Sequence, residues 1–537
     1  MRVTNGMMRT SSMLNMRMNK ISYDKYLQQY NTQKKIQRPS DDPTIAVRAL
    51  KYRTTLTEIE QYQRNIDDAT SWMDATETAI KDVDKVLDNM VQYVTQAATG
   101  TVNANDRADI SKQLDQYAKY IYEQDMNADY AGRYLFTGYR TDSPLLFDGP
   151  SDKVTYTIHE QLDIKNIRKY DFVYGSASIG DSDPTSPDYK TAQDYAAEAP
   201  QFESTNRILV SYQDLCTDDF YSEVTKYDPN GSEYTLTYGT SFILYRDKNG
   251  LEKNAAVEIK KIPDDTIYNE HLKPGDDEVW LVAETGELVF GDKIYDEIRG
   301  GSNLAITYQK KEFDKNDIRP EHYFVCEAVD ENGKNWIYNT DKNNLYDFDY
   351  YDNYTPAPQN ITYQINFSQT IQVNTEGYKA VGTEIGRGIE DAKNTINELD
   401  VIEAKMSEVK KRIGDLDEGS DADKIADLKE LESQLQTQMD LQKSVLVKTL
   451  GAMITTIQDA KNKINEALAD HGSRYNRMVM TENKLKELDI DTEQSKSDNE
   501  DSDLGDAYIN FTESNMLYQA TLNATSKVLG QSLLDFI

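Results

Sequence analysis

Apolar residues recur every seven positions through the stretch that begins near residue 59. The two seams of this repeat are Ile59, Ile66, Met73, Ile80, Leu87 and Val94, and Tyr62, Ala69, Thr76, Val83, Met90 and Ala97. A heptad spacing that continues for about six repeats predicts a coiled-coil helix. At a rise of 1.5 Å per residue, about 50 residues form a rod of roughly 75 Å.

Both ends of the chain also carry helical patterns. Near the start, Leu14, Met18 and Ile21 are spaced by four and three, and Leu27 continues this apolar face. A last helix is predicted from about Leu504 to Leu529. It has two apolar stripes, Leu517, Ala520, Ala524 and Val528, and Tyr508, Phe511, Tyr518, Leu522 and Leu529. Two stripes on one helix indicate two neighbours at once, as inside an assembly.

The motif "RPSDDP", residues 38–43, separates the first helix from the heptad stretch. Pro39 lacks an N–H and disfavours a helical conformation at Arg38, so the first helix should end by about Gln37. Pro43 suits the first position of a new helix, and Asp42 can cap that helix and complement its dipole. The motif therefore predicts a tight joint between two helices.

Strand signals dominate from about residue 145 to 380. The alternating segments are "KVTYTI", "YTLTYGTSFILYR" and "NITYQINF", and the turns of the Asp/Asn-Gly type are "YDPNGSE", "RDKNGL" and "DENGKNW". Helical periodicity returns near Gly382, and residues 400–445 are predicted to form an antiparallel helical hairpin. The segment "DIDTEQSKSDNEDSD" is predicted to be an acidic linker before the last helix.

These patterns predict an α+β protein, with a long coiled-coil rod built from both chain ends and a β-rich tip domain inserted between them. The expected boundaries are 1–44 (first helix and joint), 45–144 (N-terminal half of the rod), 145–380 (β-rich insert of one or two domains), 381–490 (C-terminal half of the rod with its hairpin) and 491–537 (acidic linker and last helix).

Composition narrows the classes of partner. The chain has 93 acidic and 59 basic residues and a formal charge of −34, which disfavours nucleic acid. No apolar run approaches the ~18 residues that a membrane span needs, so no membrane partner is expected. Cys216 and Cys326 have no metal-type spacing, so neither a zinc site nor a disulfide framework is expected.

The first 40 residues carry many basic residues and a single acid, Asp24. A mitochondrial transit peptide has such a composition, but the helical pattern continues without a cleavage-like site. No apolar core of a secretory signal is present either. We expect this segment to belong to the mature protein.

Catalytic chemistry is not expected. The four histidines, at 159, 271, 322 and 471, lie in no known catalytic spacing with a serine, cysteine or acid. No phosphate-binding glycine loop opens a helix, and neither a cofactor nor a metal site is predicted. The acidic loops 346–354 and 330–333 lack the spacing of an EF-hand, so solvated turns are favoured over weak calcium sites.

Six motifs together point to a known family: "MRVTNGMM", "IQRPSDDPTIAVRAL", "EIEQYQRNIDDATSWM", "GRYLFTG", "MTENKL" and "SKVLGQSLLDFI". As a set they resemble the hook-associated protein 3 family of hook–filament junction proteins, within the flagellin superfamily. The resemblance covers about residues 1–147 and 450–537. The sequence departs from the family at Asn31, Thr32 and Gln33, where a turn of the Ser-Thr-Gly type is usual. The insert and the 400–445 hairpin are also longer than usual.

The resemblance implies a structural protein of the extracellular bacterial flagellum, exported through the flagellar type III channel with its N-terminus kept. It implies a ring of about eleven subunits between hook-associated protein 1 and the flagellin filament, and an export chaperone. The terminal segments are then poorly ordered in the monomer and pair as the innermost layer of the assembly, where burial by neighbouring subunits offsets the ordering cost.

Under this reading the apolar terminal residues form the assembly interface. The candidates are Leu14, Met18, Ile21, Leu27, Leu517, Leu522, Val528, Leu529, Leu533, Leu534 and Phe536. The joint candidates are Arg38, Pro39, Ser40, Asp41, Asp42 and Pro43. Arg38, Asp41 and Asp42 either fix the angle between the two helices or serve as ordinary helix caps.

Three other functions stay open. Flagellin itself, or a minor filament subunit, shares the architecture. A surface adhesin or glycan-binding module in the tyrosine-rich insert is compatible with the junction role. An intracellular coiled-coil scaffold is disfavoured by the matched ends.

Overall fold

The computed structural model describes residues 4–99, 103–174, 179–217, 221–227, 233–239, 242–247, 249–261, 273–301, 304–340, 354–417 and 420–530. It divides into two compact units. Unit 1 comprises Met1–Thr70, Tyr363–Ile371 and Arg474–Ile537, and unit 2 comprises Ser71–Thr362 and Gln372–Ser473. The long helices α2 (Pro43–Ala97) and α9 (Ala422–Glu500) contribute to both units.

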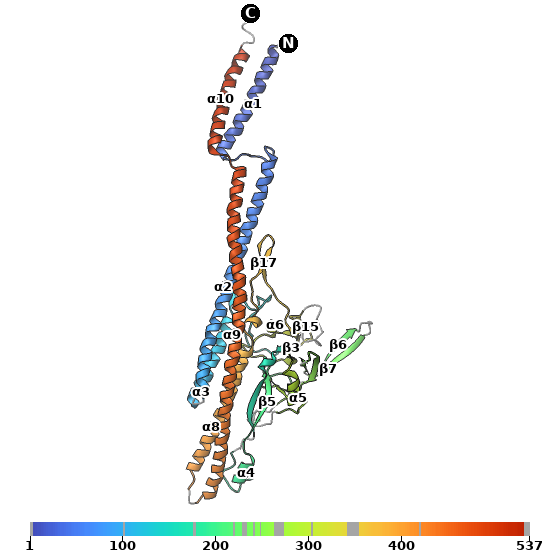
Figure 1. The fold of residues 1–537 in the computed structure, drawn as a ribbon, viewed down its shortest axis with the longest axis vertical. Helices are drawn as coiled ribbons and strands as arrows, with labels where there is room; N and C mark the ends of the chain where they lie inside the picture. Colours follow the sequence, from blue (N-terminus) through green and yellow to red (C-terminus); the bar gives the residue numbers. More distant parts are fainter. Residues whose placement is uncertain are drawn as a thin grey trace. The chain divides into compact units, whose positions relative to one another are not determined.

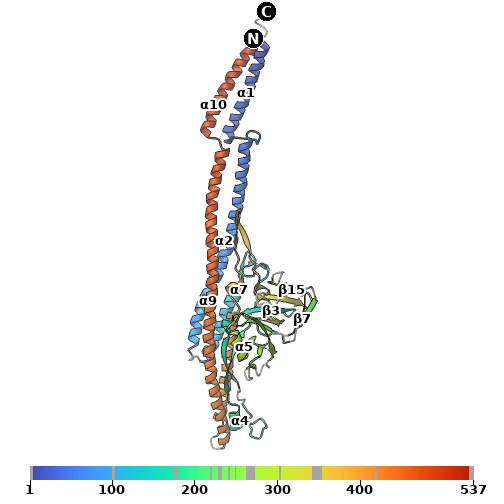
Figure 2. The same ribbon diagram turned by 45° about the vertical axis from the view of Figure 1, so that its right-hand side comes forward.

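Unit 1 contains the two chain ends. The helices α1 (Asn5–Thr32) and α10 (Leu504–Gly530) lie side by side in both views (Figures 1 and 2). Ile59 and Ile66 of α2 are fully buried in this unit, as are Met478 and Leu485 of α9. A hairpin of β16 (Thr362–Asn366) and β17 (Gln369–Gln372) packs on these helices, where Phe367 meets the ring of Tyr62 edge-on at 5.2 Å.

The predicted heptad seams are confirmed along α2. All six residues of the first seam are 0–1% exposed, and in the second seam only Tyr62 is half-buried while the other five are buried. In unit 2 the rest of α2 contacts α9 through Lys461, which binds Asp88, and α3 (Ala104–Lys119) through the rings of Tyr93 and Tyr117. Helix α3 continues into the π-helix η1 (Tyr120–Asp125) and packs on α8 (Glu384–Gly414). Arg107 of α3 is buried and donates hydrogen bonds to Asp400 (2.7 Å) and Glu403 (2.6 Å) of α8.

The predicted β-rich insert is a pair of sheets in unit 2. The six-stranded sheet is antiparallel in the order β15-β14-β3-β13-β8-β9, with bounds β3 (Val154–Leu162), β8 (Phe242–Arg246), β9 (Glu252–Ala256), β13 (Leu304–Lys310), β14 (Val325–Asp330) and β15 (Asn335–Tyr338). The five-stranded sheet has the order β10-β11-β12-β5-β4, with bounds β4 (Arg168–Tyr174), β5 (Gln201–Leu209), β10 (Glu258–Lys260), β11 (Val279–Val282) and β12 (Glu287–Phe290). In this sheet β10 and β11 are parallel and the other pairs are antiparallel.

Smaller elements complete the chain. They are β1 (Asp129–Tyr130), β2 (Arg133–Tyr134), η2 (Ile164–Asn166), α4 (Ala192–Ala197), the pair β6 (Tyr221–Tyr227) and β7 (Glu233–Gly239), α5 (Asp292–Ile298), α6 (Pro320–Tyr323) and α7 (Gly377–Ala380). The predicted turns of "RDKNGL" and "DENGKNW" join β8 to β9 and β14 to β15, and both pairs are antiparallel as expected. The predicted turn of "YDPNGSE" lies mostly outside the described residues, and the flanking strands β6 and β7 are antiparallel. The α+β fold class is therefore confirmed.

One apolar core holds the two sheets of the insert together. It includes fully buried residues from both, such as Ile158 and Ile306 of the six-stranded sheet and Leu281 and Leu288 of the five-stranded sheet. A self-contained core of this size is typical of a domain that stabilises itself.

The predicted helical hairpin is present, with α8 ending at Gly414 and α9 beginning at Ala422. A segment of the insert, residues 179–200, covers it. Tyr195 of α4 is buried against Met406, Val409, Leu431 and Leu435 of the two helices. The hydroxyl of Tyr189 donates a hydrogen bond to Asp427 at 2.6 Å.

One local expectation needs correction. The segment 489–500, predicted to be a linker, is the end of α9; it holds no glycine or proline that would stop a helix, and its charges are largely solvated. The first helix ends at Thr32, within the expected limit of about Gln37. The short strand β2 covers only Arg133 and Tyr134. Helix α3 starts at Ala104 and is capped by Asn103, whose side chain accepts a hydrogen bond from Asp106 N.

No helix in the described part of the chain is long and apolar enough to cross a membrane.

Candidate assembly interface

The seam between α1 and α10 consists of aromatic and polar side chains. Tyr23 stacks on Tyr518, with ring centroids 5.5 Å apart, and also contacts Phe511. Tyr30 stacks on Phe511 with its centroid at 5.7 Å. Asn19 Nδ2 donates a hydrogen bond to Thr521 Oγ1 at 2.6 Å. The two chain ends therefore join through residues that are only partly apolar.

Large apolar side chains instead cover the outer faces of the same two helices. Leu14, Met18 and Ile21 of α1 are 59–61% exposed, and Leu517 and Leu522 of α10 are 52% and 40% exposed. Leu27 is half-buried. Burial of such surface is worth roughly 25 cal/mol per Å². These helices therefore offer a large apolar area to a further partner.

Some of the predicted interface residues are not placed. Val528 and Leu529 lie in α10, but their side chains are not described, and Leu533, Leu534 and Phe536 lie outside the described residues. The sequence reasoning also left out apolar residues that share the exposed surface. These are Met7, Met8 and Met13 of α1 and Leu504, Ile509 and Met516 of α10. Ile509 and Met516 are seven positions apart, and this spacing was visible in the sequence.

The predicted joint begins with a left-handed residue. Gln33, which stands where the family that the sequence resembles usually has glycine, takes φ 57° at the end of α1, and its N–H donates to Gln29 O at 2.8 Å. An L-residue in this conformation carries a modest strain that glycine avoids. The departure from the family turn has therefore kept the left-handed helix stop.

Asp41 and Asp42 both accept hydrogen bonds from backbone N–H groups of the joint. Asp41 accepts hydrogen bonds from the N–H groups of Arg38 (2.9 Å) and Gln37 (3.1 Å), and these bonds lower the pKa of its carboxyl group. Asp42 accepts from Ile45 N and Thr44 N at the start of α2, which lowers its pKa in the same way. Pro43 takes the first helical position as predicted. Asp42 is therefore a cap of α2, whereas Asp41 closes the turn that precedes it, and a role of either acid in fixing the angle stays a prediction.

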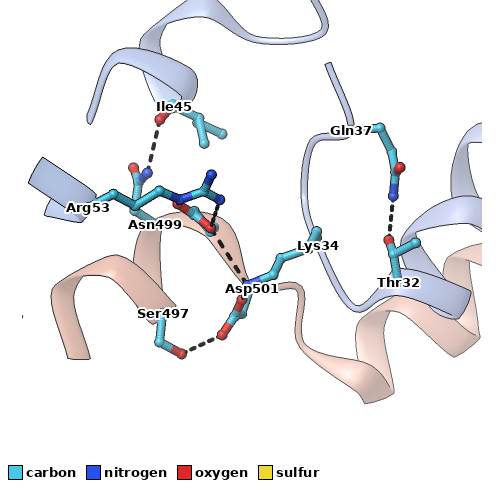
Figure 3. Close-up of polar contacts among 9 residues, drawn as sticks. Thr32, Lys34, Gln37, Ile45, Arg53, Ser497, Asn499 and Asp501 are labelled. Atoms are coloured by element: carbon cyan, nitrogen blue, oxygen red, sulfur yellow. Dashed lines mark hydrogen bonds and ion pairs between the residues drawn. The ribbon is translucent and has the colours of Figure 1, made fainter. Parts of the chain in front are cut away.

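The cross-connection at the joint comes from residues that the sequence reasoning missed (Figure 3). Lys34 binds Asp501, and this bond raises the pKa of Lys34 and lowers the pKa of Asp501. Arg53 of α2 makes a bidentate pair with Glu500, at 3.1 and 2.8 Å. The Glu500 side chain is only 4% exposed and also lies 3.6 Å from Lys34.

Backbone bonds run beside these ion pairs. Lys35 N donates to Glu500 O at 2.7 Å, and Ser502 N donates to Gln33 O at 2.8 Å. Asn499 Nδ2 donates to Ile45 O at 3.0 Å (Figure 3). We call Lys34, Arg53, Glu500 and Asp501 the joint clamp. It links the chain before α2 and the start of α2 to the end of α9, nearly 450 positions away. No local sequence signal reveals a pairing at that separation.

Of the two acidic loops expected to be solvated turns, the structure describes only one in full. Most of the loop 346–354 lies outside the described residues. Asp330 in the loop 330–333 accepts bonds from Asn332 N (2.9 Å) and Lys334 N (2.8 Å), so it closes its own turn. Among the described residues no group of three or more His, Cys, Asp or Glu is placed to hold a metal ion.

Comparison with known proteins concerns the two ends. Residues 3–141 match the bacterial flagellin N-terminal helical region, and residues 454–537 match the bacterial flagellin C-terminal helical region. The chain is 27% identical over 143 residues to flagellar hook-associated protein 3 of Escherichia coli K12, which is 27% of this chain and 45% of that protein. It is 26% identical over 159 residues to flagellar hook-associated protein 3 of Salmonella typhimurium LT2, which is 30% of this chain and 49% of that protein.

The matches thus span about half the length of these two relatives. Among solved structures, FlgL of Xanthomonas campestris aligns over 83% of this chain and 99% of its own, with 11% identity and a TM-score of 0.31. The matched sequences at both ends support a flagellar structural protein with flagellin-type helical termini.

Proposed function

We propose that the protein forms the junction between hook-associated protein 1 and the flagellin filament of a bacterial flagellum. The observation that carries this proposal is that the α1–α10 pair has polar and aromatic side chains between its helices and aliphatic side chains on its outer faces. Its internal seam is aromatic and polar, whereas Leu14, Met18, Ile21 and Leu517 face away from it. Such a pair gains most of its apolar burial from other subunits.

The similarity to two proteins named flagellar hook-associated protein 3 supports the junction in preference to another flagellar position. About eleven subunits would form a ring, the number that the family resemblance implies. Its interfaces would be head to tail, as an open helical assembly requires. One face of the ring would meet hook-associated protein 1 and the other the first flagellin subunits.

We propose the export route to the junction on the same grounds, the resemblance to hook-associated protein 3. The chain would leave the cell through the flagellar type III export channel, held beforehand by an export chaperone. The joint clamp and the backbone hydrogen bonds of Asp41 and Asp42 would then set the angle between the terminal helices, α1 and α10, and the start of α2.

Deletion of the gene in its source bacterium tests the junction role. Electron microscopy should show bare hooks, and flagellin should accumulate in the medium because export continues without a base for the filament. Return of the intact gene should restore filaments. Normal filaments on the deletion strain would refute the proposal.

A truncation separates assembly from folding. Removal of Leu529–Ile537 should abolish filaments in the complementation assay, because part of the apolar terminal surface is lost, while far-UV circular dichroism should show the long helices intact. Filaments at normal frequency with the truncated protein would contradict an assembly role for this end.

The flagellin-type ends fit flagellin, or a minor filament subunit, equally well. Purified protein distinguishes these roles. A filament subunit polymerises into long filaments on seeds, whereas a junction protein stops after a short cap.

A further inference from the structure

A cavity of about 380 Å³ lies between the sheets of the insert and the helices α8 and α9. Strands β3, β4 and β5 contribute to its wall, and every residue that lines it belongs to unit 2. Sites that bind small molecules usually measure roughly 300–1,000 Å³. The junction role rests on the terminal helices, so this cavity is free for a function of its own.

Arg168 of β4 brings a half-buried positive charge to this cavity. Its guanidinium group donates to the backbone oxygen of Ala452 and, at 3.0 Å, to Thr456 Oγ1, and both of these acceptors are neutral. Asp459 and Asp391 act on it only as more distant charges, and it forms no ion pair in the described part of the chain. A guanidinium group has five N–H donors, so donors remain for a ligand. Burial lowers the pKa of Arg168, as expected for a cation that no contacting carboxylate compensates.

The other cations of the lining differ from Arg168 because a carboxylate or water already compensates them. Arg207 binds Asp391 at 2.7 Å, and Lys448 binds Asp171. Lys169 is exposed, so water solvates its charge. The remaining pairs are Arg387 with Glu390 and Lys463 with Glu384. A ligand that neutralises Arg168 therefore needs one negative charge, and a second one would meet the carboxylates of Asp171 and Asp391.

Aromatic rings and small polar side chains form other parts of the wall. Tyr170, Phe324 and Tyr378 are half-buried, so part of each ring can contact a ligand. The polar side chains include Thr355, Thr383 and Asn166. Such a wall suits a ligand that has an apolar face for the rings and several hydroxyl groups for hydrogen bonds, and a sugar ring has both.

We propose that this cavity binds a sugar with a single carboxylate, such as a uronic or sialic acid, whose carboxylate pairs with Arg168. The planar guanidinium fork matches the two oxygens of a carboxylate. The sugar ring would lie against the half-buried aromatic rings. The proposal gives a defined site to the glycan-binding module that the sequence leaves open, and it does not rest on the junction role. A free sugar acid and the same sugar at the end of a glycan offer Arg168 the same chemistry.

Ligand-detected saturation-transfer NMR with the full-length chain tests the class of ligand. The probes are D-glucuronic acid, N-acetylneuraminic acid, neutral D-glucose and inorganic phosphate. At least one sugar acid should bind, with a Kd about tenfold or more below that of glucose. The methyl glycoside of that acid distinguishes a glycan end, where the anomeric position is blocked, from a free acid. Absence of binding by both acids, equal binding of glucose, or tighter binding of phosphate would overturn the proposal.

A charge variant tests the role of Arg168. Arg168→Gln removes the charge but keeps an amide that can donate to Thr456, and it should weaken binding of the sugar acid by about tenfold or more. Arg299→Gln is the matched control, because it makes the same change on an exposed arginine outside the lining. It should bind the acid as the parent does. Unchanged affinity in Arg168→Gln would refute the pairing.

A second variant fills the cavity and leaves Arg168 in place. A Cβ added at Gly388 of α8, which lines the cavity, meets only Met453 Cγ, at 3.9 Å, outside the backbone of its own helix. Gly388→Leu should abolish binding without loss of thermal stability, since leucine favours a helix more than glycine does. Gly472→Leu makes the same change in α9 outside the lining and should bind as the parent does. Full binding by Gly388→Leu would overturn this site.

Discussion

The terminal helix pair and the β insert bury their apolar residues in opposite ways. In α1 and α10 the largest aliphatic side chains are exposed, and the shared seam contains Asn19, Thr521 and stacked tyrosines. In the insert, residues such as Ile158, Leu281 and Ile306 are fully buried between two sheets of the same chain. The comparison indicates that the insert has an apolar core of its own, whereas the terminal pair leaves its apolar surface exposed, as our proposal that other subunits complete it requires.

Charge placed on the exposed apolar face of α1 tests whether this face is a contact between subunits. The double change Leu14→Asp and Ile21→Asp should abolish filament formation in the complementation assay, because two carboxylates would enter an apolar subunit contact. The monomer should unfold at an unchanged temperature. Asn15→Asp, on an exposed position of the same helix, should leave filaments normal. Loss of monomer stability in the double variant would show that the face is internal.

A substitution that leaves a cavity in the core of the insert should lower the stability of the insert. Ile158→Ala removes a fully buried side chain and should lower the free energy of unfolding of the insert by about 2–5 kcal/mol. Val329→Ala, on the neighbouring strand and 37% exposed, should cost less than about 1 kcal/mol. Urea unfolding measures both values. Similar losses in the two variants would contradict a tightly packed core.

Two buried histidines make the insert sensitive to acid. Burial lowers the pKa of His159 to about 3 and of His322 to about 4, from 6.5. The unfolded chain binds these protons first, so the stability that the neutral rings provide is present above pH 6.5 and decreases below it. Each should cost about 2 kcal/mol between pH 7 and pH 5.

Urea unfolding of the parent and of His322→Gln at these two pH values checks this. The variant should lose about half of the histidine-dependent fall in the free energy of unfolding between pH 7 and pH 5. An unaltered pH dependence in the variant would show that His322 does not contribute to this fall.

The joint clamp should produce the smallest effect. Arg53→Ala leaves the buried carboxylate of Glu500 with Lys34 alone, at 3.6 Å. We expect the joint to weaken by about 1–3 kcal/mol, seen as faster hydrogen exchange near residues 33–50 and 497–502. Arg48→Ala removes an exposed arginine of the same helix and should change nothing. Equal exchange in both variants would refute the clamp.

Local sequence patterns were enough to predict the long helices and the joint between the first two, although not the end of α9. The heptad residues Ile59 to Val94 are buried because a period of seven places them on one side of a helix, whatever its partner. Pro39, Asp42 and Pro43 interrupt and restart the chain through their own backbone chemistry. The hairpin turns were equally local, since Asp/Asn-Gly pairs favour the backbone conformations of tight turns.

Which distant residues contact each other became known only from the tertiary structure. The pairing of Arg53 with Glu500 and of Arg207 with Asp391, and the order of strands in the two sheets, rest on contacts between segments far apart in the chain. Alternation shows which face of a strand is buried, but not which strand lies beside it. The apolar stripes of α1 and α10 were read from the sequence. That their seam is filled by Tyr23, Tyr30 and Asn19, which leaves Leu14 and Ile21 exposed, depends on how the two helices rotate against each other.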